Sequence, residues 1–132
     1  MANEAVCIET PTKFARDTVA DGTGIAIGTL LKLTDPNTAE ATAADNDPFA
    51  GIAWEEKTAS DGITEITAAL DGIWDIKDSG AGITAGAIAN VGGANLIIAS
   101  AAADLLTGSV VGKALETAGA AEVIRVRVGA LV

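Results

Sequence analysis

The alternation of apolar and polar residues predicts two β-hairpins of one design. Residues 51–72 carry apolar side chains at alternate positions on both sides of a Ser-Asp-Gly turn, and the alternation returns in residues 112–129, where arginines separate the apolar positions. The apolar positions are Ile52, Trp54, Ile66, Ala68 and Leu70 in the first copy and Ile124, Val126 and Val128 in the second. A period of two is typical of strands with one buried face. The pattern therefore indicates a duplicated β unit.

A pattern of glycines extends the duplication. Residues 21–33 match residues 79–91, and the three glycines of the first segment recur 58 positions later (80 − 22). The matched glycines are Gly22, Gly24 and Gly28 with Gly80, Gly82 and Gly86. Each copy then reverses direction, at Asp35-Pro36-Asn37 in the first and at Gly92-Gly93 in the second, residues that suit tight turns. We expect pseudo-repeats at about 21–72 and 79–130.

The connecting segments differ between the copies. Residues 45–48 read as a loop, whereas residues 99–106 have the propensity for about two turns of helix. Residues 73–77 alternate as a further strand that has no counterpart after Val128. Nine or ten short strands separated by glycine turns predict an all-β fold, an antiparallel barrel or sandwich built from two tandem units. We expect one β domain over residues 21–132, with the two units packed on each other.

Residues 1–20 show no steady period after a short strand-like stretch at residues 5–10. We predict an extended N-terminal arm that adds to the sheet edge of a partner protein. The alternative is that this segment forms the first strand of the domain's own sheet. The candidate binding residues are Val6, Ile8, Pro11, Lys13, Phe14 and Arg16.

Composition narrows the choice of function. A chain of 132 residues fits one domain, and with only two Phe, two Trp and no Tyr its core must consist of small aliphatic side chains. The net charge of −10 would repel a phosphate backbone, so we expect no nucleic-acid binding. Cys7 is the single cysteine and there is no histidine, which argues against a disulfide, a structural zinc site and a thiol nucleophile.

No motif predicts catalysis, a cofactor or a metal. The glycines at 22–28 lack the strand-glycine-helix order of a nucleotide loop, and strand alternation turns most carboxylates of residues 55–71 outward. Asp45-Asn46-Asp47 lacks the ligand spacing of a calcium loop. The apolar run 96–106 is too short to span a bilayer, and the first 17 residues lack the apolar core of a signal peptide. We expect synthesis in the cytoplasm and no membrane association.

Two pairs of residues are candidates for a subunit interface. Trp54 and Trp74 are the only large rings, and each either fills the core or lies at a contact between subunits. Arg125 and Arg127 share one face of the last strand, where they either pair with Glu116 or Glu122 or contact another protomer.

The stretches PFAGIAWEE, DGITEITAALDGIWDI, SGAGITAGA and VVGKALETAGAAEVIRVRVG, taken in this order, resemble the capsid cement or head decoration proteins of tailed bacteriophages. This family was long catalogued only as a domain of unknown function. The resemblance covers the chain from about Gly22 onward. It implies a β-barrel body that binds the outside of an assembled capsid, often as a homotrimer, and bridges subunits of the major capsid protein. The Ala-rich connector and the N-terminal segment depart from the family pattern.

We therefore expect a structural protein on the exterior of a virion, without enzymatic activity. Many identical copies bound around a shell add their binding energies through multivalency. The alternative is a surface-displayed carbohydrate or cell-surface binding module, suggested by the loops and the two tryptophans. An enzyme is the weakest hypothesis, since only scattered carboxylates support it.

Overall fold

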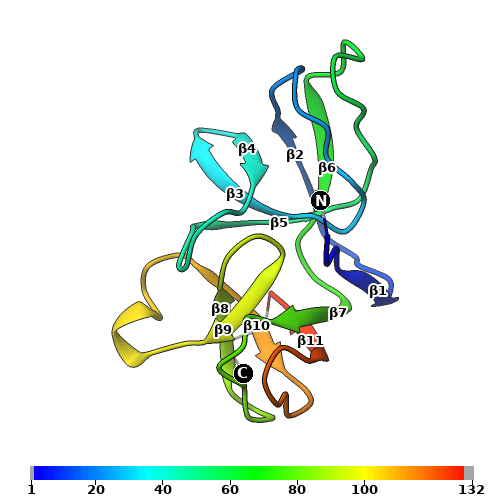
Figure 1. Cartoon of the computed structure of the whole chain (residues 1–132). Coiled ribbons are helices and arrows are strands. Elements are labelled where there is room, and N and C mark those ends of the chain that lie inside the picture. Colours follow the sequence, from blue (N-terminus) through cyan, green and yellow to red (C-terminus); the bar gives the residue numbers. More distant parts are fainter. Residues whose placement is uncertain (1, 130–132) are drawn as a thin grey trace.

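The computed structural model describes residues 2–129 and shows an all-β chain with two similar, closed, five-stranded barrels (Figure 1). The first barrel contains β2 (Phe14–Thr18), β3 (Leu30–Asp35), β4 (Thr38–Ala41), β5 (Phe49–Ala53) and β6 (Glu65–Ala69). The second contains β7 (Ile73–Asp78), β8 (Ile88–Val91), β9 (Leu96–Ala99), β10 (Val110–Ala114) and β11 (Val123–Val128). A further strand, β1 (Val6–Glu9), pairs with β7.

The two barrels have the same strand order. The first runs β2-β4-β3-β5-β6, and the second runs β7-β9-β8-β10-β11 around its closed ring. All pairs are antiparallel except one in each barrel: β2 pairs with β4, and β7 with β9, in parallel. The predicted tandem β units are thus confirmed, while the parallel pairs that close the barrels were not foreseen.

The predicted alternation is visible in the strands. Ile66 and Ala68 of β6 are buried, and so are Ile124 and Val126 of β11, 58 positions later (124 − 66). The reversals at residues 35–37 and 92–93 join β3 to β4 and β8 to β9. Asn37 in the first turn has φ of 52° and Gly93 in the second has φ of 124°. Asparagine and glycine are the residues that adopt positive φ at least cost. Asn95, 58 positions after Asn37 (95 − 37), has φ of 59°, so the same residue type occupies this position in both bends, although the sequence suggested different residues.

The core joins the barrels. One cluster of buried side chains belongs to the first barrel, whereas the larger cluster combines the interior of the second barrel with Leu30, Ile52 and Ala69 from β3, β5 and β6. All three of these side chains have no exposed surface. Because burying a Leu or Ile side chain contributes about 1.5–3 kcal/mol, Leu30 and Ile52 of this shared layer help to hold the two barrels together.

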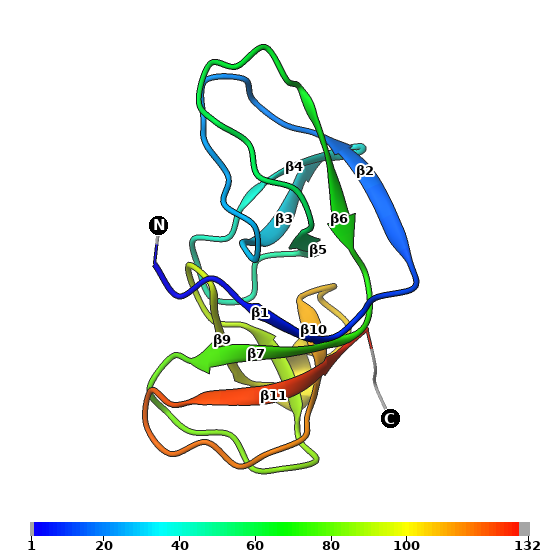
Figure 2. The ribbon, with the colours of Figure 1, turned by 90° about the vertical axis from the view of Figure 1, so that its right-hand side faces the viewer.

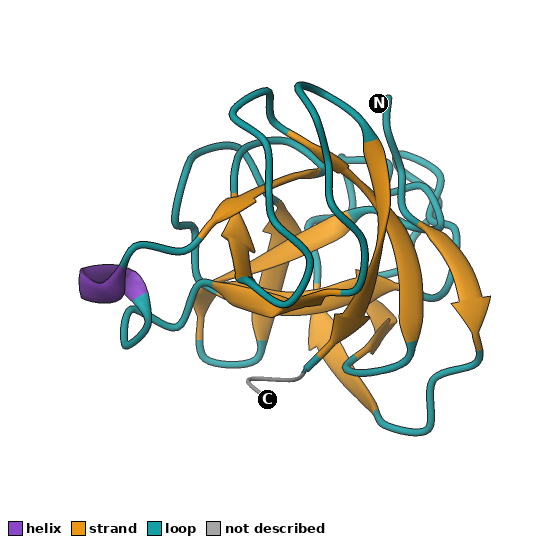
Figure 3. Ribbon diagram, turned by 90° about the horizontal axis from the view of Figure 1, so that it is seen from below, coloured by secondary structure: helices purple, strands orange, loops and turns teal. Residues whose placement is uncertain are grey.

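The connector after β9 differs from the prediction. Only Ala102–Asp104 form a helix, a single 3-10 turn, in a loop that projects from the second barrel (Figure 3). None of its residues is buried. Alanine propensity alone does not sustain a short helix that has no face packed against the body.

The N-terminal segment is part of the fold, so the prediction of an extended arm is wrong for residues 6–9 and 14–18. β1 pairs with β7 of the second barrel, and β2 pairs along its whole length with β6 of the first (Figure 2). The alternative stated above, a strand of the chain's own sheet, is what the structure contains. The side-chain period was hard to read because three of the four residues of β1 are exposed, with only Cys7 half-buried, and because β2 buries only Asp17.

The repeat also begins earlier than predicted. β7, for which the sequence showed no counterpart, corresponds to β2, since each closes its barrel on the equivalent strand: Thr18 pairs with Thr38, and Lys77 with Leu96. The sequences FARDT and IWDIKD share almost no residue types, which hid the relation. Residues 130–132, which include the predicted end of the second repeat, lie outside the described residues.

Candidate functional site

The N-terminal segment keeps apolar side chains on the surface although its backbone is held in the sheets. Val6 is 59% exposed, Ile8 39% and Phe14 44%. Lys13 and Arg16 lie beside Phe14 and are also exposed. Five of the six candidate binding residues therefore lie on the surface, and Pro11, which is buried, does not.

A carboxylate fixes the turn between β1 and β2. Asp71 accepts hydrogen bonds from the Thr12 hydroxyl at 2.6 Å and from the backbone N–H groups of Thr12 and Lys13 at 2.7 and 3.0 Å. These bonds, the Thr12 hydroxyl first, outweigh burial and lower the pKa of the Asp71 carboxyl. Asp71 thus holds Lys13 and Phe14 in place next to the link between the barrels.

The aromatic side chains form a chain of contacts from the surface to the core. The ring centroids of Phe14 and Trp54 are 5.6 Å apart, and those of Trp54 and Trp74 are 5.9 Å apart in an edge-to-face arrangement. Trp74 is 1% exposed, and its indole N–H donates to the Asp71 carbonyl at 3.0 Å. Trp74 is therefore a core residue with no surface for a subunit contact or for stacking on a glycan, and Trp54 is half-buried against it.

The arginines of the last strand contact neighbouring strands. The Arg125 side chain lies 3.6 Å from a carboxylate oxygen of Asp75 on β7, and its backbone N–H donates to Glu116 at 2.8 Å. Glu122, the other expected partner, instead accepts from the Gly119 N–H. Arg127 lines a pocket of about 300 Å³ together with Asp71 and Ile73. Arg125 thus uses a partner within the chain that the sequence did not suggest.

A buried lysine, which the sequence did not point to, closes one end of the first barrel. The Lys57 side chain has no exposed surface, and its ammonium group donates to the Asp61 carboxylate at 2.9 Å and to the backbone oxygens of Asp21 and Thr58 at 2.8 and 3.1 Å. Burial alone would lower the pKa of Lys57, but the hydrogen bonds to Asp61 and Asp21 outweigh it and raise the pKa. The Lys57 ammonium group thus anchors the loops that contain Asp21 and Asp61.

A buried carboxylate anchors loops of the second barrel. Asp78 is 0% exposed, and one of its oxygens accepts the N–H groups of Gly80, Gly82 and Ala121 at 3.0, 2.9 and 3.3 Å. Its other oxygen has no hydrogen-bond partner among the described residues. The sequence did not indicate that the Asp78 side chain would be buried, because an acidic residue in a strand is normally exposed.

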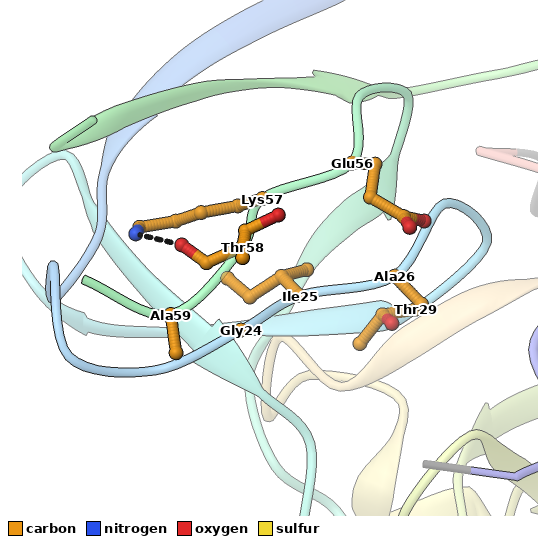
Figure 4. Close-up of a pocket in the computed structure, with 8 residues that line it drawn as sticks. All are labelled: Gly24, Ile25, Ala26, Thr29, Glu56, Lys57, Thr58 and Ala59. Carbon is orange, nitrogen blue, oxygen red and sulfur yellow. Dashed lines mark hydrogen bonds between the residues drawn. The ribbon is translucent and has the colours of Figure 1, made fainter. Parts of the chain in front are cut away.

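A pocket of about 330 Å³ opens beside Lys57, lined by residues 24–26, Thr29 and residues 56–59 (Figure 4). Lys57 points away from Glu56 and Thr29, so its ammonium group does not face the same space as the Glu56 carboxylate and the Thr29 hydroxyl (Figure 4). The Thr29 hydroxyl is buried without a partner among the described residues.

Residues 2–129 contain no group of three His, Cys, Asp or Glu side chains that could hold a metal ion, and no helix there is long and apolar enough to cross a bilayer. Asp47, in the loop Asp45-Asn46-Asp47, accepts the N–H groups of Ala43 and Ala44 at 2.8 and 2.9 Å.

Comparison with known proteins adds no relative: no family model and no curated protein matches this chain.

Proposed function

We propose that this protein is a structural decoration protein that binds the outer surface of a bacteriophage capsid and stabilises it by bridging major capsid subunits. The resemblance of the sequence to cement proteins motivates the proposal. The observation that carries it is the set of exposed apolar side chains on β1 and β2. Val6, Ile8 and Phe14 are between 39 and 59% exposed on strands whose backbones are fixed by pairing.

Such a surface suits binding to a large partner. Apolar side chains on a rigid strand lose little conformational entropy on binding, and their removal from water contributes favourably. Two basic residues, Lys13 and Arg16, lie beside Phe14 in a chain with a net charge of −10, and Arg16 is paired with Glu55 at 3.2 Å and Glu65 at 3.9 Å. In this proposal the shell holds many copies at local threefold positions, and the partner is the major capsid protein.

Co-sedimentation tests the proposal directly. The purified chain is mixed with heads assembled from the major capsid protein of the same genome, and we expect saturable binding and a higher temperature of head disruption. The double variant Val6→Lys with Ile8→Lys places charge on the apolar surface, and we expect its affinity to fall about tenfold or more, the equivalent of 1.4 kcal/mol. Its circular dichroism and Tm report whether the fold is retained.

The matched control is the double variant Ile27→Lys with Ile63→Lys. Ile27 is 53% exposed in the loop before β3 and Ile63 is 47% exposed in the loop before β6, so the two substitutions add the same charge at exposed apolar positions elsewhere. Equal loss of binding in both variants would show that net charge, not this surface, determines binding. Failure of the unmodified chain to sediment with heads would refute the proposed function.

A further inference from the structure

The edge of β2 is open at the position where its twin β7 carries an additional strand. β7 pairs with β11 on one side, and on the other it pairs with β9 at Lys77 and Asp78 and with β1 over residues 73–75. β2 pairs with β6 on one side, and on the other, within residues 2–129, it pairs only at Thr18 with Thr38 of β4. β2 lies at the margin of the molecule in Figure 2. The first barrel thus lacks the counterpart of β1.

The backbone groups on this edge point outward. The Lys13 carbonyl accepts from Leu70 and the Val19 N–H donates to Thr64, so odd-numbered residues of this strand face β6. Thr18 donates its N–H to the Asn37 carbonyl on the opposite side. Antiparallel strands alternate in this way, so the N–H and C=O groups of Phe14 and Arg16 lie on the open edge. Unpaired edge groups of this kind are a template for another strand.

The side chains differ between the twins in a way that specifies the missing strand. Thr18 corresponds to Lys77, so Ala15 corresponds to Trp74, and the strand residue opposite Trp74 is the small Cys7 of β1. In the second barrel a large residue therefore faces a small one. At the open edge the small residue, Ala15, is on β2 and is only half-buried. A strand that completes this edge needs a large apolar side chain opposite Ala15.

Charge adds a second requirement. β1 runs antiparallel to β7 and ends with Glu9 opposite Ile73, the twin of Phe14. A strand bound in the same direction to β2 ends beside Lys13, which is exposed. An acidic residue at the end of the incoming strand is therefore favoured.

We propose that the open edge of β2 binds an extended strand of another protein, antiparallel, with a large apolar side chain over Ala15 and an acidic residue next to Lys13. Main-chain hydrogen bonds to Phe14 and Arg16 supply affinity and the side-chain requirements supply specificity, as in other cases of strand addition. The chain's own β1 is already paired with β7, so its exchange between copies would break the bonds that it makes. The inference goes beyond the proposed function, because it requires no virus particle for its test.

The probe is a peptide of residues 4–10 in which leucine replaces Cys7, and the matched control peptide has alanine there. Hydrogen exchange of the unmodified chain is measured by NMR with and without peptide. In the free chain we expect the amides of Phe14 and Arg16 to exchange faster than those of Ile73 and Asp75, which β1 covers. The leucine peptide is expected to slow exchange at Phe14 and Arg16 about tenfold or more, and the alanine peptide to bind more weakly.

The amides of Ile73 and Asp75 provide the internal control, since loss of their protection would mean that the peptide displaces β1 instead. The inference is overturned by that result, by peptide-induced changes confined to other strands, or by no binding. It is also overturned if Phe14 and Arg16 are protected in the absence of peptide in a concentration-dependent way, because a second copy then covers the edge. Capsid binding without peptide binding would remove this inference and leave the proposed function standing.

Discussion

Lys57 and Ala118 occupy the same position in the two barrels. Lys57 exchanges two backbone hydrogen bonds with Ile25, and Ala118 exchanges two with Ile83. Ile83 follows Ile25 by the same 58 positions (83 − 25) that relate the glycines, and Ala118 follows Lys57 by 61 (118 − 57), because the second connector is three residues longer. The backbone is thus duplicated while the side chains have diverged. The Lys57 ammonium group forms hydrogen bonds to loops at the end of the first barrel, and the Asp78 carboxylate does so in the second.

Replacing Lys57 should open the end of the first barrel. In Lys57→Met, Asp61 and the Asp21 carbonyl lose their buried donor, and we expect a clear fall in Tm in thermal unfolding followed by circular dichroism. Lys113→Met, at a half-buried position of β10, is the control and should leave Tm nearly unchanged. An equal Tm for both variants would contradict the role given to Lys57.

The same variant should change the response to acid. Backbone N–H from Ile63 and the Lys57 ammonium lower the pKa of Asp61. A carboxyl with a lowered folded pKa stabilises the fold above its ordinary pKa of about 3.9, and this stability is lost as the pH falls through the folded pKa. We therefore expect urea midpoints to fall less steeply between about pH 5 and pH 2 in Lys57→Met than in the unmodified chain.

Asp17 should destabilise the first barrel. It is 6% exposed, and its twin position in the second barrel holds Ile76, which is fully buried. Burial raises the pKa of the Asp17 carboxyl, so ionisation costs stability as the pH rises through the ordinary pKa toward the folded one. We expect Asp17→Val to raise stability by about 1 kcal/mol at pH 7 and to remove this part of the pH dependence. Urea titrations at pH 4 and pH 7 measure both effects, and a destabilised variant at pH 7 would contradict them.

Asp71 should hold the turn between β1 and β2. Asp71→Ala removes three hydrogen bonds to Thr12 and Lys13, and we expect a loss of about 1 kcal/mol, kept small because solvent reaches the site. Faster amide exchange at Thr12 and Lys13 would identify the cause. Asp35→Ala, at an exposed strand end, is the control. Unchanged exchange at residues 12–13 would show that the turn does not depend on the carboxylate.

Gly112 should tolerate no side chain. A Cβ added there would lie 2.1 Å from the Arg127 carbonyl oxygen, whereas one added at Gly22 would meet nothing within 4 Å. We expect Gly112→Ala to cost about 1–3 kcal/mol by overpacking and Gly22→Ala to be nearly neutral. Chemical denaturation of both variants checks the difference, and two similar midpoints would argue against the close pairing of β10 with β11.

Sequence reasoning succeeded where a side chain's period or a glycine's backbone freedom determines the structure. The alternation at Ile66 and Ile124 identified equivalent buried positions, and the turns at Asn37 and Gly93 followed from residues that accept positive φ. These are local properties, so a single chain reveals them.

It failed where tertiary contacts decide. β2 looked irregular because Asp17 occupies its one buried position, and its relation to β7 rests on barrel closure, not on residue type. Lys57 and Trp74 are buried for the same kind of reason: their partners Asp21 and Trp54 lie far away in the sequence. No periodicity encodes such pairs.

β1 belongs to the first half of the chain by sequence and to the second barrel by pairing. The Ala2 carbonyl also accepts a hydrogen bond from Asn95, so the N-terminal segment contacts the second barrel at two places before the chain enters the first. Cleaving the backbone between β6 and β7 would therefore leave two fragments that remain paired through β1. The two duplicated halves cannot separate unless β1 first leaves β7.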